Sequence, residues 1–193
     1  MAHGDELIGG FSSDHTGSLR SITVENSIIS GTKNVGGIST RLNTTKLINR
    51  TSRNRIENCH ADVTVYGDSS GGFASEIAHS TLIRCSAKGS VQGKKDVSGF
   101  SISISDSDIR RSYCENKLNA ERVSLFACTI GDSKINNCFT LSETPSINPN
   151  IVTEVINTDI ETLYWSGVEH SIQQPCGTPI NTTDKSDFNS MIL

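Results

Sequence analysis

The chain has 193 residues, enough for one domain with a hydrophobic core. Apolar residues make up 34% and aromatic residues 5%, a composition too apolar for disorder and too poor in large side chains for an ordinary two-layer core. The net charge of −4 and the pI near 5.7 argue against nucleic acid or an anionic membrane as a partner, because no stripe of Lys and Arg is present.

No apolar run approaches the roughly 20 residues of a transmembrane helix, so membrane insertion is not expected. The N-terminal residues MAHGDELIGG lack the basic and apolar regions of a signal peptide. The chain therefore stays where it is made, leaves by another route, or is a segment of a larger chain.

A repeat starts near the N-terminus and recurs along most of the chain. Its anchor is the apolar residue that follows a glycine pair or its equivalent. The anchors are Phe11, Ile38, Phe73, Phe100 and Phe126, at intervals of 27, 35, 27 and 26 residues. Apolar or small residues follow most anchors at two and four positions, an alternation typical of strands.

The second segment needs a second anchor to align. Residues 55–67, RIENCHADVTVYG, match residues 81–93, TLIRCSAKGSVQG, with Cys59 on Cys85 and Gly67 on Gly93. This alignment leaves nine extra residues in the second segment, which we place within residues 43–53. The inserted loop is a candidate binding element through Asn43, Lys46, Asn49, Arg50 and Arg53.

A period near 27 with short alternating strands predicts an all-β fold, a parallel β-helix (β-solenoid) of about five coils over residues 1–140. Each coil adds about 4.8 Å and stacks equivalent residues in ladders. A leucine-rich repeat has a similar period, but its Leu-rich consensus is absent. A β-sandwich offers no reason for the recurring register.

The third segment is similar to the glycine-rich GLUG repeat, whose pattern is roughly GGLVG…I.NCYATGSVSG. The matching residues are Gly71, Gly72, Phe73, Cys85, Ala87, Gly89, Val91 and Gly93, and the resemblance extends over about residues 8–140. That family occurs in large bacterial surface and secreted proteins, including the non-catalytic region of immunoglobulin-A-cleaving metalloproteases. The resemblance implies a right-handed β-helix scaffold and a secreted or cell-surface location rather than a reaction.

Cysteines recur at one position of the repeat. Cys59, Cys85 and Cys138 share this position, and Cys114 lies two residues beyond it. With the stacked phenylalanines Phe73, Phe100 and Phe126, they are expected to form a buried core ladder. Disulfides and a metal column are the alternatives, but the in-strand neighbour His60 should face outward, so neither a metal nor another cofactor is expected.

Two acids are the nearest approach to a catalytic pair of the kind that β-helix glycosidases and lyases use. Asp106 and Asp108 lie in SDSDIRR, beside Arg110 and Arg111. Asp and Ser are also ordinary turn residues, and the repeat predicts a turn at this point. The turn interpretation is the stronger one, and no HExxH or phosphate-loop motif is present.

The tail, residues 141–193, departs from the repeat and is expected to cap the solenoid. Residues 152–164 carry apolar residues near helical spacing after an Asn-Pro-Asn start, which predicts a capping helix. Farther on, Cys176 with His170, oriented by Asp184 or Asp187, could form a thiol nucleophile, although proximity in sequence is a weak indication.

Taken together, the pattern favours a non-catalytic scaffold or binding module of a secreted or surface-associated bacterial protein, with a protein or a glycan as partner. A β-helix carbohydrate-active enzyme is the alternative. An effector with a Cys176 nucleophile is the third possibility.

Overall fold

Short strands separated by tight corners make up the described part of the chain. A computed structural model describes residues 2–4, 6–43, 53–145, 150–161 and 163–165. Within these residues the chain forms strands β1 to β23 and no helix. The strands of one coil pair in parallel with the equivalent strands of the next coil, as in β9 (His60–Gly67) with β13 (Ser86–Gly93). The predicted all-β parallel solenoid is therefore confirmed.

Four strands form each complete coil. The first coil contains β2 (Leu7–Gly9), β3 (Ser12–His15), β4 (Leu19–Arg20) and β5 (Thr23–Gly31), and β1 (Ala2–Gly4) precedes it. The second contains β6 (Asn34–Gly36), β7 (Ser39–Asn43), β8 (Asn54–Glu57) and β9 (His60–Gly67). The third contains β10 (Ser69–Gly71), β11 (Ala74–Ala78), β12 (Ser80–Ile83) and β13 (Ser86–Gly93).

The later coils follow the same order. The fourth contains β14 (Asp96–Ser98), β15 (Ser101–Ser105), β16 (Asp108–Arg110) and β17 (Tyr113–Asn119). The fifth contains β18 (Arg122–Gly131), β19 (Lys134–Asn136) and β20 (Cys138–Thr140). A further partial coil contains β21 (Asn150–Ile156), β22 (Asp159–Ile160) and β23 (Leu163–Trp165).

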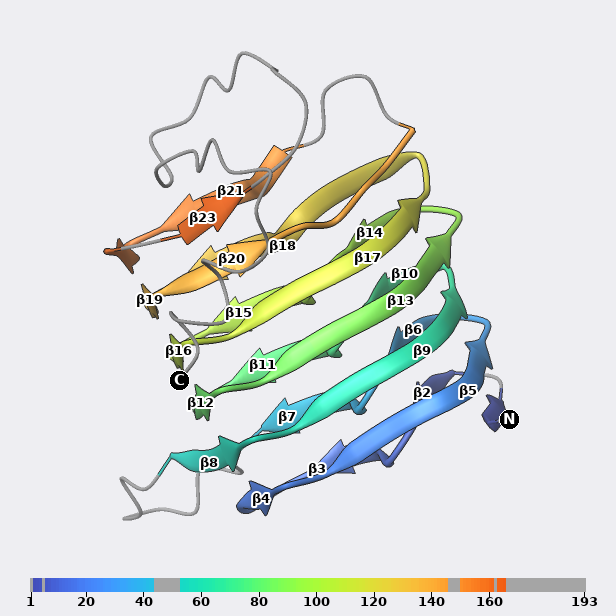
Figure 1. The fold of residues 1–193 in the computed structure, drawn as a ribbon, viewed down its shortest axis with the longest axis horizontal. Coiled ribbons are helices and arrows are strands. Elements are labelled where there is room, and N and C mark those ends of the chain that lie inside the picture. The colour runs from blue at the N-terminus through green and yellow to red at the C-terminus, as the bar shows by residue number, and fades with distance from the viewer. Residues whose placement is uncertain (1, 5, 44–52, 146–149, 162, 166–193) are drawn as a thin grey trace.

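Stacking of the coils produces three parallel sheets. Sheet A has the order β1-β5-β9-β13-β17-β20-β23, and sheet C has the order β22-β19-β16-β12-β8-β4. Sheet B contains two strands from each of the first four coils, on either side of the glycine pair or its equivalent, and then the single strands β18 and β21. In Figure 1 the chain runs rightward along the front sheet, returns behind it and climbs one strand per coil, so the solenoid is right-handed.

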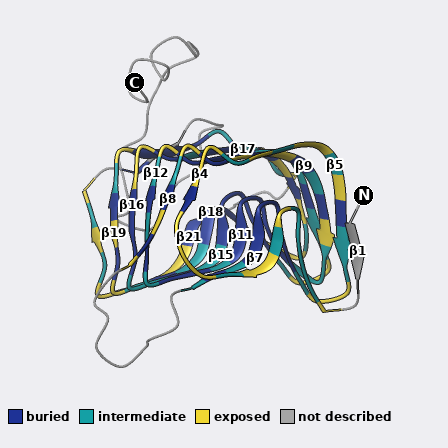
Figure 2. Cartoon of the chain, turned by 90° about the horizontal axis from the view of Figure 1, so that it is seen from below, coloured by how far each residue is buried: buried dark blue, intermediate teal, exposed yellow. Residues whose placement is uncertain are grey.

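Interior side chains stack in columns along the solenoid. The rings of Phe73 and Phe100 lie 4.9 Å apart and those of Phe100 and Phe126 lie 5.1 Å apart, nearly parallel in both pairs. All three are fully buried. Figure 2 shows buried positions recurring from coil to coil. Each coil needs few apolar residues because the adjacent coils bury them.

The second coil carries the predicted insertion. Ten residues separate Asn43 from Asn54, whereas one residue separates their partners Ala78 and Ser80 in the third coil. After the insertion and β8, strand β9 pairs with β13 in the expected register, with His60 opposite Ser86 and Gly67 opposite Gly93. Residues 44–52 of the insertion lie outside the described residues.

Two kinds of bend shape each coil. The glycine pair lies at a close approach of backbones, since a Cβ at Gly71 would lie 1.9 Å from the carbonyl oxygen of Ala74 and one at Gly72 would lie 2.2 Å from that of Gly99. The corners between sheets instead use left-handed residues that are not glycine, a conformation that Asn and Asp tolerate best. These residues are Ser21, Asn58, Arg84, Arg111 and Asn137 between sheets C and A, and His79, Asp106, Asp132 and Asn157 between sheets B and C.

The predicted capping helix is wrong, because strands β21, β22 and β23 continue the solenoid. β21 pairs with β18, β22 with β19 and β23 with β20. Val152, Val155 and Ile160 show near-helical spacing because they belong to two short strands joined by a left-handed corner at Asn157. Apolar residues alternate every two positions within a strand, and the corner shifts this alternation from one strand to the next. The β-branched residues of this segment favour strands.

Candidate functional site

The corner between sheets B and C places Asp106 in an ion-pair cluster. Its two carboxylate oxygens contact Nδ1 of His79 at 2.6 Å and Nη2 of Arg53 at 2.7 Å. The hydrogen bond from His79, followed by the charge of Arg53, holds the pKa of Asp106 below its ordinary value. Asp106 is therefore ionised at neutral pH, which suits an ion pair and not a general acid.

Asp108 opens strand β16 and is almost fully buried. Its carboxylate accepts two hydrogen bonds from Arg110, at 2.8 Å from Nε and 2.5 Å from Nη2. This bidentate contact raises the pKa of Arg110. Asp106 thus pairs with Arg53 and His79, whereas Asp108 pairs with Arg110 of its own strand.

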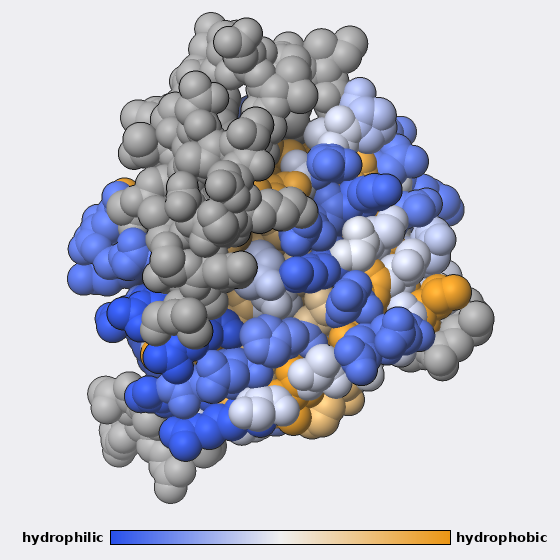
Figure 3. Space-filling model, viewed as in Figure 1, coloured by the Kyte–Doolittle hydropathy of each residue, from blue (hydrophilic) through white to orange (hydrophobic). Residues whose placement is uncertain are grey.

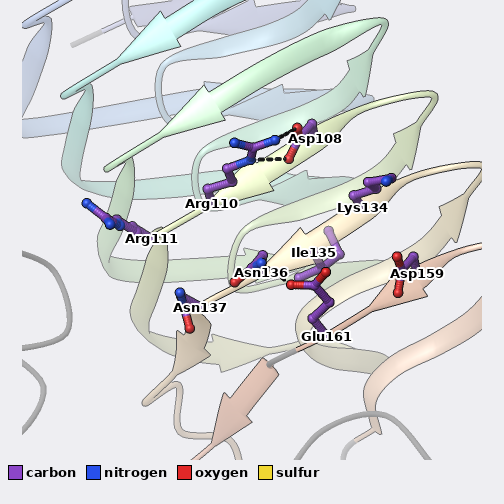
Figure 4. A pocket seen from close by; sticks show the side chains of 9 residues that line it. All are labelled: Asp108, Arg110, Arg111, Lys134, Ile135, Asn136, Asn137, Asp159 and Glu161. Carbon is purple, nitrogen blue, oxygen red and sulfur yellow. Dashed lines mark hydrogen bonds and ion pairs between the residues drawn. The ribbon is translucent and has the colours of Figure 1, made fainter.

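A charged pocket of about 350 Å³ lies beside Asp108 on the outer side of sheet C (Figure 4). Its lining comprises Asp108, Arg110, Arg111, Lys134, Ile135, Asn136, Asn137, Asp159 and Glu161. Asn136 donates a hydrogen bond to Glu161 across adjacent coils. The sequence pattern identified Asp108 and the two arginines. It missed Lys134, Asp159 and Glu161, because these come from the two following coils and approach Asp108 only when the coils stack.

The outer face of sheet A carries a second cluster, which we call the Tyr113 cluster: His60, Ser86, Lys88, Tyr113 and Glu115. Nζ of Lys88 lies 5.4 Å from the centre of the Tyr113 ring and 3.4 Å from Oε2 of Glu115. The other side of the cluster holds a hydrogen bond of 2.8 Å between Nδ1 of His60 and Oγ of Ser86. Figure 3 looks onto the face of sheet A, and the part of it that is not covered in grey is largely hydrophilic.

Electrostatics set the charges of Lys88 and His60 in the Tyr113 cluster, and stacking sets the orientation of the Tyr113 ring. Burial lowers the pKa of Lys88, but Tyr113 and Glu115 outweigh that effect and raise it. Burial and the charge of Lys88 lower the pKa of His60, so this imidazole is neutral at pH 7. The Tyr113 ring stacks on Phe139 at 4.9 Å with an interplanar angle of 4°, which fixes its orientation.

Cysteines line the corner between sheets C and A from the inside. Cys59, Cys85, Cys114 and Cys138 are buried free thiols, and Cys128 is partly buried. The thiols of Cys59, Cys85 and Cys138 donate to the carbonyl two residues earlier, as the Ser112 hydroxyl does in the fourth coil. The thiol thus serves as a corner hydrogen-bond donor, a role that composition alone does not reveal.

Burial also decides the reactivity of these thiols. It raises the pKa of Cys114 and Cys138 to about 12 and that of Cys85 well above its ordinary value. A hydrogen bond from Cys85 lowers the pKa of Cys59 to about 7, but the Cys59 side chain is 0% exposed. None of these four thiols is placed to act as a nucleophile.

Several predicted site residues lie outside the described residues: Lys46, Asn49, Arg50, His170, Cys176, Asp184 and Asp187. Asn43 is the last residue of β7, and Arg53 lies across the insertion from it, in the ion pair with Asp106. The insertion therefore starts and ends next to the Asp106 corner. The Cys176 nucleophile stays a prediction.

Comparisons with family models, curated proteins and solved structures found no match to this chain. The described residues contain no group of three or more His, Cys, Asp or Glu side chains arranged to hold a metal ion. Over the same part of the chain, no helix has the length and apolar character needed to cross a membrane.

Proposed function

We propose that this protein is a non-catalytic scaffold and binding module of a secreted or surface-associated bacterial protein, which binds a glycan or a protein through the outer face of sheet A. The observation that carries the proposal is the Tyr113 cluster, an aromatic ring flanked by a cation and a carboxylate on a rigid sheet. The bacterial and extracellular setting rests on the resemblance to the GLUG repeat.

The chemistry of the cluster favours a glycan. Phe139 stacks on the Tyr113 ring and Lys88 lies over it, so the ring offers its edge and hydroxyl, together with the neighbouring charged groups, to the hydroxyls of a sugar. Lys88 donates hydrogen bonds and Glu115 accepts them, at either end of one ion pair. Since the strands on both sides of β13 hold it in register from Ser86 to Gln92, this surface is preorganised.

The environments of Asp106 and Asp108, the two acids predicted as a possible catalytic pair, favour a binding function over glycoside hydrolysis. Hydrolysis of a glycosidic bond needs one carboxyl group that stays protonated near neutral pH. The pKa of Asp106 is lowered, and Asp108 is held by the Arg110 fork. Asp106 therefore lacks the environment of a general acid, and both carboxylate oxygens of Asp108 already accept hydrogen bonds from Arg110.

A glycan array and a protein array test the proposal. We expect wild-type protein to bind one group of ligands without turnover, and the Tyr113→Ala variant to lose this binding. The matched control is Arg122→Ala, which removes an exposed side chain paired with Asp96 on sheet B. Equal binding by wild type and Tyr113→Ala would reject the outer face of sheet A as the binding surface.

A β-helix carbohydrate-active enzyme is a second candidate, favoured by the pocket beside Asp108. Three carboxylates and three cationic side chains line it, the mixture that sugar subsites of such enzymes require. Incubation with polysaccharides and assay of released reducing ends or unsaturated products would detect it. Activity that Glu161→Gln and Asp159→Asn abolish would establish this function, and absence of products would exclude it for the substrates tested.

A further inference from the structure

The charged pocket on the outer side of sheet C crosses three neighbouring strands, β16, β19 and β22. Arg110 and Arg111 lie at the end of β16, on one side of the pocket, whereas Asp159 and Glu161 lie on and just after β22, on the other side. Adjacent strands are about 4.8 Å apart, so the two sides are separated by about 10 Å. Figure 4 shows the guanidinium group of Arg111 and the carboxylate of Asp159 at opposite ends of the pocket. The pocket therefore has a cationic side and an anionic side.

Lys134 lies on the middle strand of the pocket and its charge is not neutralised by the described residues. On the outer face of sheet A, Lys88 pairs with Glu115 of the adjacent strand. Lys134 has a carboxylate neighbour in register on each adjacent strand, Asp108 on β16 and Asp159 on β22. Over the described part of the chain, however, neither the ammonium group of Lys134 nor the carboxylate of Asp159 has an ion-pair partner. Both groups are exposed and open to a ligand.

Arg110 explains why Lys134 does not pair with Asp108. The guanidinium group of Arg110 holds both oxygens of the almost fully buried Asp108 carboxylate, from Nε at 2.8 Å and from Nη2 at 2.5 Å. A guanidinium group has more N–H donors than this fork uses, so Arg110 can still donate to a ligand. Arg111 follows it at the left-handed corner, with a φ of 50°, and forms no ion pair with another described residue. The β16 side of the pocket thus offers donors to an anionic group.

We propose that this pocket binds a short peptide with free termini, with its carboxylate at Arg110 and Arg111 and its ammonium group at Asp159 and Glu161. Three carboxylates and three cationic side chains line the pocket, so a ligand with charge of only one sign would be repelled by one side. A zwitterion meets opposite charge on both sides. The volume of about 350 Å³ lies at the lower end of the range for small-molecule sites.

The separation of the two sides selects a peptide over a single amino acid. The charged groups of one amino acid lie within one residue of each other, whereas an extended tripeptide spans about 10 Å. The ammonium group of Lys134, between the two sides, donates to the peptide carbonyl oxygens in this arrangement. The site is on sheet C and is separate from the Tyr113 cluster, so it goes beyond the function proposed above.

An NMR titration of the isotopically labelled full chain with trialanine tests the peptide site. We expect a Kd on the order of 1 mM or tighter, with shifts concentrated in the backbone amides of β16, β19 and β22. Acetylation of the peptide removes its ammonium charge and amidation removes its carboxylate charge. Each modification should weaken binding by at least about fivefold.

Two variants test the orientation of the peptide. Asp159→Asn should remove most of the preference for a free ammonium group, and Arg111→Gln should remove most of the preference for a free carboxylate. The matched controls are Glu154→Gln, on β21 of the same coil, and Arg84→Gln, the equivalent left-handed corner residue one coil earlier. Both controls should leave the Kd within about twofold of wild type, and the amide spectrum of each variant reports whether it is folded.

The proposal has three results that would overturn it. The first is the absence of trialanine binding to wild-type protein. The second is equal binding of trialanine and of the peptide capped at both ends, which would remove charge recognition. The third is binding that Asp159→Asn and Arg111→Gln leave unchanged, or a loss of preference for the opposite terminus in either variant.

Discussion

The interior columns and the outer columns of the solenoid follow different rules. Inside, Leu82, Ile109 and Ile135 occupy one column of sheet C, all branched aliphatic residues and all fully buried. On the outside of the same sheet, the neighbouring column changes from Thr81 to Asp108 and then Lys134. Similarity between coils therefore marks packing, and change between coils marks positions available for recognition.

Thiol reactivity gives the largest expected contrast between interior and exterior. At pH 8 the pKa values of about 12 for Cys114 and Cys138 and about 11 for Cys128 leave almost no thiolate. Together with burial, this should make alkylation of these cysteines at least about a thousandfold slower than in the unfolded chain.

Mass spectrometry after timed labelling with iodoacetamide measures these rates at each cysteine. Cys59 and Cys85 should also be protected, because both side chains are 0% exposed. Rapid labelling of Cys176 alone would support the predicted nucleophile. Protection of all six cysteines would refute the Cys176 nucleophile. Rapid labelling of Cys114 would contradict its burial in the core ladder.

Truncation of Phe100 should cost the most stability. Its ring is fully buried between Phe73 and Phe126, so Phe100→Ala leaves a cavity in the middle of the stack. We expect the free energy of unfolding to fall by about 3–5 kcal/mol. Urea denaturation measures this change, with Tyr66→Ala on the exterior as the control, for which we expect a change smaller by several-fold.

The serines that follow the left-handed corner between sheets B and C, Ser80, Ser107 and Ser133, should rank next, because the N–H groups of Ser80 and Ser107 each donate to the serine hydroxyl of the following coil. Oγ of Ser107 accepts a hydrogen bond from the N–H of Ser80 at 3.1 Å and donates one to the carbonyl of Ser105 at 2.7 Å. Ser107→Ala leaves a buried N–H unsatisfied, which should cost about 1–3 kcal/mol. Ser90→Ala on the outer face of sheet A serves as the comparison, and an equal cost for both would refute the corner role.

The Asp106 corner should give the smallest effect, visible as a dependence on pH. Because the folded-state pKa of Asp106 is lowered, its stabilising contribution is complete above the unfolded pKa of about 4 and is lost as the pH falls through the folded value. Asp106→Asn should thus be less stable than wild type at pH 7, and the difference should shrink in acid. A difference independent of pH would assign the effect to the left-handed backbone instead.

The repeated positions explain how much of this fold the sequence could predict. Phe73 and Phe100 recur at one position of the repeat and Cys59 and Cys85 at another, and these two recurrences were sufficient to predict the coils and the insertion. The helix expected near Val152 failed because the corner at Asn157 shifts the alternation. A one-residue corner leaves no signal in hydrophobic periodicity.

The candidate sites were harder to predict because they cross coils. Lys88 and Tyr113 belong to different coils, and their proximity exists only after stacking brings β13 beside β17. Asp106 was identified as a turn residue, but its partners His79 and Arg53 come from two earlier segments. Local spacing carries no information about such contacts until the register of the coils is known.

Titration of the best array ligand into wild-type protein and the Tyr113→Ala variant asks whether the outer face of sheet A is the binding surface. We expect Tyr113→Ala to weaken binding by at least about tenfold, the loss typical of an aromatic anchor, and Arg122→Ala to leave it unchanged. Undiminished affinity in Tyr113→Ala, in a variant that is folded, would contradict this expectation.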